Sequence, residues 1–116
     1  MKIDQETVDK VAGFADLDDL YALLGNEVLG EGWGASAEDD EERRRFGSRW
    51  FEDRVDAFRE KICGGKVAAE LTGDLSSDIV TIASLELPFA NDNQKLAVII
   101  AAIIARRGLA AFCAGY

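Results

Sequence analysis

The chain has 116 residues, which is enough for one folded domain with a real core and hardly enough for two. Hydrophobic residues make up 48% of it and charged residues 30%, a balance typical of globular proteins. There are 22 acidic and 13 basic residues and no histidine, which excludes imidazole-based zinc sites and Ser-His-Asp or Cys-His catalysis within the chain. The net charge of −9 also argues against nucleic acid as a partner.

The first elements predicted along the chain are two helices in an acidic region. Residues 5–13 form a short helix candidate, and Asp16 is a suitable N-cap for a second helix over 17–29. In that second helix the apolar side chains recur at helical spacing. They are Leu17, Leu20, Tyr21, Leu24 and Val28. A glycine-rich loop that carries Trp33 ends the helix.

A long amphipathic helix over 37–62 is the most clearly defined element. Ser36 is placed to cap it, and acids that precede arginines by four residues favour the helical state. Gly64 and Gly65 end it. Its apolar stripe is Phe46, Trp50, Phe51, Val55, Phe58 and Ile62.

The second half of the chain is predicted to be helical as well. Residues 66–71 form a short turn of helix, and 109–116 add a short final one. The segment 75–87 contains β-branched residues that favour a strand, but its polar and apolar residues do not alternate, so we expect a helix that ends at Pro88.

The helix over 94–107 is apolar on every side, which is typical of the centre of a bundle. Asp92 or Asn93 caps its start, and Arg106 and Arg107 suit the dipole at its end. We therefore expect an all-α protein, a compact single-domain bundle (1–116) of about five to six helices around this central helix. The side chains expected to be substantially buried are Trp50, Phe51, Phe58 and Ile100.

The cysteines and the apolar C-terminal segment bear on the compartment. Cys63 and Cys113 are far apart and have apolar neighbours, so we expect two buried free thiols. No secretory signal pattern opens the chain, which favours the cytoplasm. The segment 96–115 is interrupted by Arg106 and Arg107, so a core helix is favoured over a membrane span.

No motif indicates catalysis, a cofactor or a metal. The glycines within 30–34 lack the spacing of a dinucleotide-binding loop, and the Gly-Gly-Lys at 64–66 lacks the remainder of a phosphate-binding loop. An EF-hand-like spacing that begins at Asp16 has Leu20 where an oxygen ligand is needed and Tyr21 where the sharp turn needs glycine. We therefore expect a protein without enzymatic activity, cofactor or metal.

Charge is distributed unevenly along the chain. Residues 1–42 hold 13 acids and two lysines, whereas 43–60 hold six arginines and four acids. An exposed helix face with local ion pairs would explain the arginines, but two charged surfaces on one domain also permit association between proteins. The predicted protein-binding residues are Arg43, Arg44, Arg45, Arg49, Asp18, Asp19, Glu38, Asp39 and Trp33.

Two functions fit these features. The first is a non-enzymatic interaction or assembly module, an adaptor whose opposed acidic and arginine-rich surfaces bind a protein partner or a second copy. The alternative is an acidic antitoxin or immunity-type inhibitor that covers a basic partner protein with the acids of 1–42, with electrostatic steering of the encounter.

Overall fold

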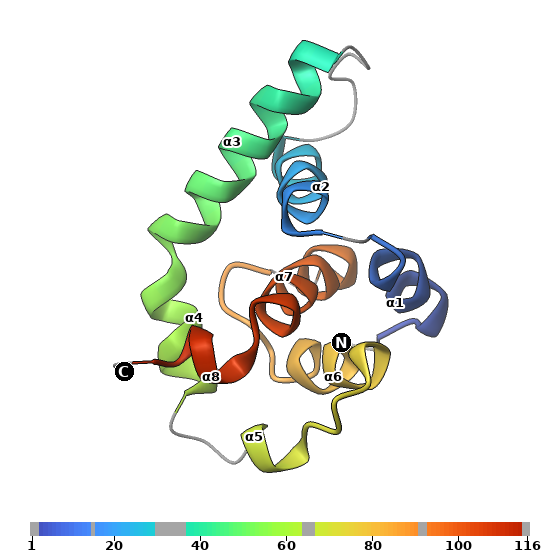
Figure 1. The fold of residues 1–116 in the computed structure, drawn as a ribbon, viewed down its shortest axis with the longest axis vertical. Coiled ribbons are helices and arrows are strands. Elements are labelled where there is room, and N and C mark those ends of the chain that lie inside the picture. Colours follow the sequence, from blue (N-terminus) through green and yellow to red (C-terminus); the bar gives the residue numbers. More distant parts are fainter. Residues whose placement is uncertain (1–2, 15, 30–36, 64–66, 91–92, 115–116) are drawn as a thin grey trace.

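The computed structural model of the protein is built of helices (Figure 1). It describes residues 3–14, 16–29, 37–63, 67–90 and 93–114. These residues form eight helices and no strand, so the all-α prediction is confirmed. The radius of gyration is 13.5 Å, as expected for a compact domain of this length. The helices are α1 (Gln5–Ala12), α2 (Leu17–Leu29), α3 (Ala37–Asp53), α4 (Val55–Ile62), α5 (Val67–Glu70), α6 (Leu75–Ala83), α7 (Gln94–Arg107) and α8 (Leu109–Phe112).

Helix α7 is the centre of the bundle, as its uniformly apolar sequence predicts. Every residue from Leu96 to Ile104 is buried, and α1, α2, α6 and α8 all contact the helix. The Oδ1 atom of Asn93 accepts a hydrogen bond from Leu96 N at 3.2 Å and caps the start of α7. Gly108 ends it with a φ of 85°, a conformation in which glycine is favoured.

The predicted helix over 37–62 is in fact two helices, α3 and α4. The helix breaks at Arg54 (φ −114°, ψ 5°), and the Nη1 atom of Arg54 donates to the carbonyl oxygen of Trp50 at 3.1 Å. A straight helix over 37–62 would be about 39 Å long, close to the longest extent of the molecule, which is 41 Å. The break turns α4 against the rest of the bundle, so that Phe51 and Phe58 meet with ring centroids 5.3 Å apart.

The predicted burial of the aromatic stripe is correct only in part. Phe51, Phe58 and Ile100 are completely buried, whereas Trp50 is half-buried and Phe46 is 38% exposed. Helix α3 presents the face of Gly47 and Phe51 to α2, and this turns Phe46 toward solvent.

Helix α6 confirms the helical interpretation of 75–87 and corrects its end. The Oδ2 atom of Asp74 accepts from Ser77 N at 3.0 Å, which caps the start. The helix ends at Ala83, well before Pro88, and Glu86 has a φ of 57°. Tertiary contacts with α7 and α1 outweigh the strand propensity of the isoleucines and valine in this segment.

Cys63 and Cys113 form a disulfide, so the prediction of two free thiols is wrong. Their Cα atoms lie 5.6 Å apart, within the usual range for a bridge. The chain turns at Gly108, and α8 then lies beside α4, where Arg59 Nε donates to Phe112 O at 2.8 Å (Figure 1). Disulfides persist mainly in proteins of oxidising compartments, so the bridge weighs against the expected cytoplasmic location, which stays a prediction.

Candidate protein-binding surface

The surface that carries the predicted binding residues is built on a close crossing of α2 and α3. A Cβ atom added to Gly47 would overlap the carbonyl oxygen of Tyr21 and would lie 2.9 Å from the backbone nitrogen of Gly25. A Cβ atom on Gly25 would overlap the carbonyl oxygen of Arg43. Both positions therefore require glycine, because any side chain would push the two helices apart. The sequence analysis did not predict that Gly25 and Gly47 face each other. The sequence feature that could have indicated it is the presence of one glycine within each of the two helical patterns.

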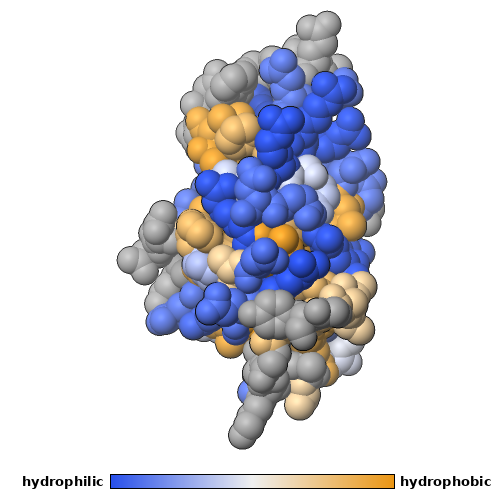
Figure 2. All heavy atoms as spheres, turned by 90° about the vertical axis from the view of Figure 1, so that its left-hand side faces the viewer, coloured by the Kyte–Doolittle hydropathy of each residue, from blue (hydrophilic) through white to orange (hydrophobic). Residues whose placement is uncertain are grey.

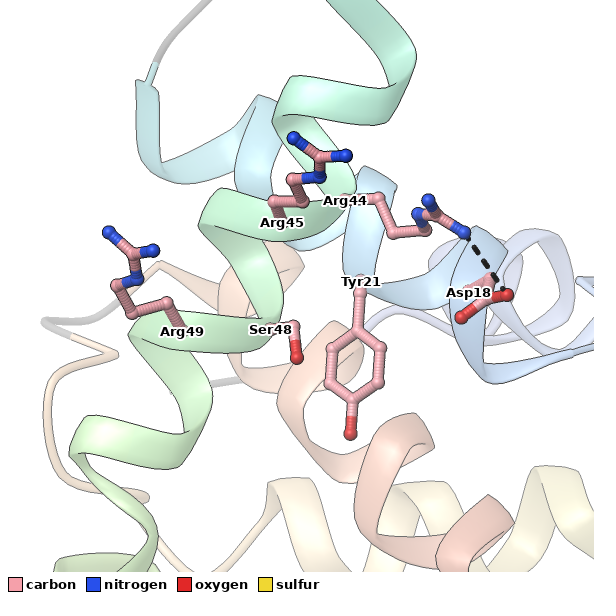
Figure 3. A pocket seen from close by; sticks show the side chains of 6 residues that line it. All are labelled: Asp18, Tyr21, Arg44, Arg45, Ser48 and Arg49. Atoms are coloured by element: carbon pink, nitrogen blue, oxygen red, sulfur yellow. Dashed lines mark hydrogen bonds and ion pairs between the residues drawn. The ribbon is translucent and has the colours of Figure 1, made fainter.

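The crossing brings acidic and basic residues of the two helices together. Arg44 Nη1 lies 3.4 Å from Asp18 Oδ2, and Arg44 Nη2 lies 3.5 Å from Glu41 Oε1 (Figure 3). Glu41 also pairs with Arg45 at 2.9 Å. All four side chains are substantially exposed, so these ion pairs contribute little to stability. The acidic and arginine-rich surfaces, expected to be opposed, adjoin along the contact between α2 and α3.

A shallow hollow of about 400 Å³ lies beside this contact. Arg44 and Arg45 line it from one turn of α3, and Arg49 lines it from the next turn. Arg44 extends toward Asp18, whereas Arg45 and Arg49 extend away from Tyr21 (Figure 3). Among the described residues, no acidic side chain pairs with Arg49, which is exposed. Guanidinium groups bind carboxylates through paired hydrogen bonds, so this surface suits acidic side chains of another protein. The hollow is lined by Asp18, Tyr21, Arg44, Arg45, Ser48 and Arg49.

Tyr21 forms the inner wall of the hollow and is not activated as a nucleophile. Its burial raises the pKa of the hydroxyl above the ordinary value of 10.0, and this outweighs the opposite effect of the Arg107 guanidinium. The hydroxyl therefore keeps its proton at neutral pH. The Tyr21 hydroxyl points away from Arg44, Arg45 and Arg49, so Ser48 is the neutral hydroxyl group nearest to them in the hollow (Figure 3).

The structure divides the predicted binding residues between places. Asp18, Arg44, Arg45 and Arg49 share the hollow described above. Arg43 is buried and lines a separate hollow of about 260 Å³, whose other walls include Asp19 and Phe14. Three predicted residues cannot be placed in this way. Trp33 and the side chains of Glu38 and Asp39 lie outside the residues that the structure describes.

An aromatic cluster next to the arginines was also missed by the sequence analysis. Phe89 is 45% exposed, and its ring meets that of Trp50 edge to face with the centroids 6.4 Å apart. The guanidinium carbon of Arg54 lies 4.4 Å from the Trp50 ring centroid and 5.4 Å from that of Phe89. Phe89 is distant in sequence from α3, so no local pattern could have placed it there.

Other kinds of site find no support in the part of the chain that the structure describes. No group of three or more Cys, Asp or Glu side chains there could hold a metal ion. None of the helices described is both long and apolar enough to cross a membrane. Comparisons of the chain with protein-family models, curated proteins and solved structures find no significant match.

Proposed function

We propose that this protein is a non-enzymatic interaction module that binds an acidic segment of a partner protein through the arginine surface of α3. The observation that carries the proposal is that Arg44, Arg45 and Arg49 all line one hollow (Figure 3). Arginine and aromatic residues contribute most to the energy of protein interfaces, and Trp50, which follows Arg49 in α3, meets the exposed ring of Phe89.

The chemistry around the hollow supports binding rather than catalysis. The protein has no histidine, and burial keeps the Tyr21 hydroxyl protonated at neutral pH. Arginine does not exchange protons in this range either. The groups of the hollow are therefore suited to holding a carboxylate by charge and hydrogen bonds.

Charge reversal at Arg49 tests the proposal. A fluorescein-labelled oligoglutamate peptide that contains one tryptophan should bind at low salt, and Arg49→Glu should weaken that binding about tenfold, because an attractive pair becomes repulsive. Lys61→Glu is the matched control, since it changes the net charge equally at an exposed position on α4. Equal effects of the two variants, or no binding of the peptide to the unaltered protein, would refute the proposal.

One observation favours the alternative of an acidic inhibitor. Asp16, Asp18 and Asp19 are all exposed at the start of α2. Carboxylates grouped in this way would steer the protein to a basic partner. This alternative predicts that Asp18→Asn and Asp19→Asn slow the capture of a basic protein such as a cationic nuclease, whereas Arg49→Glu leaves the capture rate unchanged.

A further inference from the structure

The outer side of α3 carries apolar rings beside its arginines, which we name the aromatic–arginine stripe. It consists of Phe46, Trp50 and Phe89 together with Arg49 and Arg54. Phe46 and Trp50 lie one helical turn apart, and Phe89 continues the row from its loop. Figure 2 shows the side of the molecule formed by α3 and α4, where patches of apolar atoms border a mainly hydrophilic surface.

The conformation of Phe89 indicates that this exposed ring is held in place by the fold. Its φ is 69°, a region that residues with large side chains rarely occupy. Its ring nevertheless contacts Trp50 and Phe58, with the centroids 6.4 Å and 6.2 Å away. Residues held in such rarely occupied backbone conformations cluster at functional sites.

A complementary feature lies at the junction of α1 and α2, which we name the acidic corner. Phe14 is 36% exposed there, and the nearby carboxylates of Asp9, Asp16 and Asp19 are exposed too. The backbone is anchored, because Arg106 Nη2 donates to the carbonyl oxygen of Phe14 at 2.9 Å. Phe14 and Asp19 of this corner also line the hollow of Arg43 on α3. The acidic corner and the stripe have no residue in common, so they are two different surfaces.

We propose that the aromatic–arginine stripe of one molecule receives the acidic corner of a second copy of this chain. The inference rests on the proposed function and names its partner. Phe14 would pack against the rings of Phe46 and Trp50, while the carboxylates of the corner would face Arg49. Because the two surfaces differ, each copy can bind one neighbour on each side, and the assembly grows as an open chain.

Two complementary variants test this pairing. Phe46→Ser combined with Arg49→Glu disables the stripe and leaves the acidic corner intact, and Phe14→Ser does the reverse. All three positions are exposed, so both variants should fold, which circular dichroism can verify. Sedimentation velocity at low salt should show wild-type protein growing beyond a dimer with concentration, and each variant alone as a monomer. An equimolar mixture should form a dimer and nothing larger, because one functional pair of surfaces remains.

Salt supplies an independent check. The wild-type assemblies should dissociate as salt rises, because the Debye length shortens from about 30 Å at 0.01 M to about 3 Å at 1 M. A mixture of variants that stays monomeric would overturn the proposal, and so would a wild type that stops at a dimer. Binding of single-stranded oligouridylate in preference to self-association would also overturn it.

The proposed function can survive the failure of this inference. A wild type that is monomeric at low salt, but whose binding of the oligoglutamate peptide still depends on Arg49, would refute self-association alone. Loss of both properties would refute both proposals.

Discussion

Replacement of Gly47 by alanine should destabilise the protein, although alanine is the better helix former. Within a helix the substitution alone would contribute about 0.5–1 kcal/mol of stability. In this structure, however, the new Cβ atom would overlap the carbonyl oxygen of Tyr21 and lie 2.9 Å from the nitrogen of Gly25. Both obstacles are backbone atoms, so no side-chain rotation can relieve the overlap.

The expected cost follows from the movement that the extra methyl group forces. Helices α2 and α3 must separate, which loosens the contacts of Tyr21 and Phe51, whose ring centroids are 6.1 Å apart. Overpacking of this kind costs about 1–3 kcal/mol and occasionally more. The penalty exceeds the gain in helix propensity, so we expect a net loss of about 1–2 kcal/mol.

Chemical denaturation followed by far-ultraviolet circular dichroism measures this loss. Ser48→Ala is the matched control, because it alters the next residue of α3 and should change the free energy of unfolding by less than about 0.5 kcal/mol. Gly25→Ala should also destabilise, and the double variant should cost less than the sum of the two, since both clashes are relieved by the same separation. A Gly47→Ala protein as stable as wild type, or more stable, would refute the close crossing.

Three further expectations concern the core and the bridge. Loss of the disulfide in a Cys63→Ala, Cys113→Ala variant should lower the free energy of unfolding by about 4 kcal/mol, the chain-entropy value for a separation of 50 residues. Reductant should lower the melting temperature of the wild-type protein only, and two reactive thiols in the native protein would contradict the bridge. Ile100→Ala should cost about 2–5 kcal/mol in chemical denaturation, because Ile100 is fully buried in α7, and a loss below about 0.5 kcal/mol would remove it from the core. The free energy of unfolding should fall as the pH rises above about 10, because the pKa of Tyr21 is raised in the folded state. The unfolded chain then releases a proton that the folded protein retains. In a series of unfolding free energies measured against pH, Tyr21→Phe should flatten this part of the curve.

Part of the candidate surface could be predicted from the sequence. The density of arginines in 43–60 singled out Arg44, Arg45 and Arg49, and their helical spacing placed them along one element. The pairing of Arg44 with Asp18 could not be foreseen, because it depends on how α2 crosses α3. The position of Phe89 beside Trp50 likewise depends on the path of a distant loop.

The sequence by itself determined which segments are helical and which helix is central. Caps such as Asn93 and Asp74 act within three residues, and the periodicity of apolar side chains is a local property, so both can be read along the chain. The burial of α7 follows for the same reason, since a helix that is apolar on every side is stable only when other helices surround it.

Only the tertiary structure decided where helices break and which distant residues meet. The separation of α3 from α4 at Arg54 serves the packing of Phe51 against Phe58, and the bridge between Cys63 and Cys113 depends on the return of α8 to α4. The closeness of α2 and α3 depends on two glycines that face each other across the contact. These features arise from contacts between residues far apart in sequence, where the geometry is set by how whole helices pack and not by any local preference.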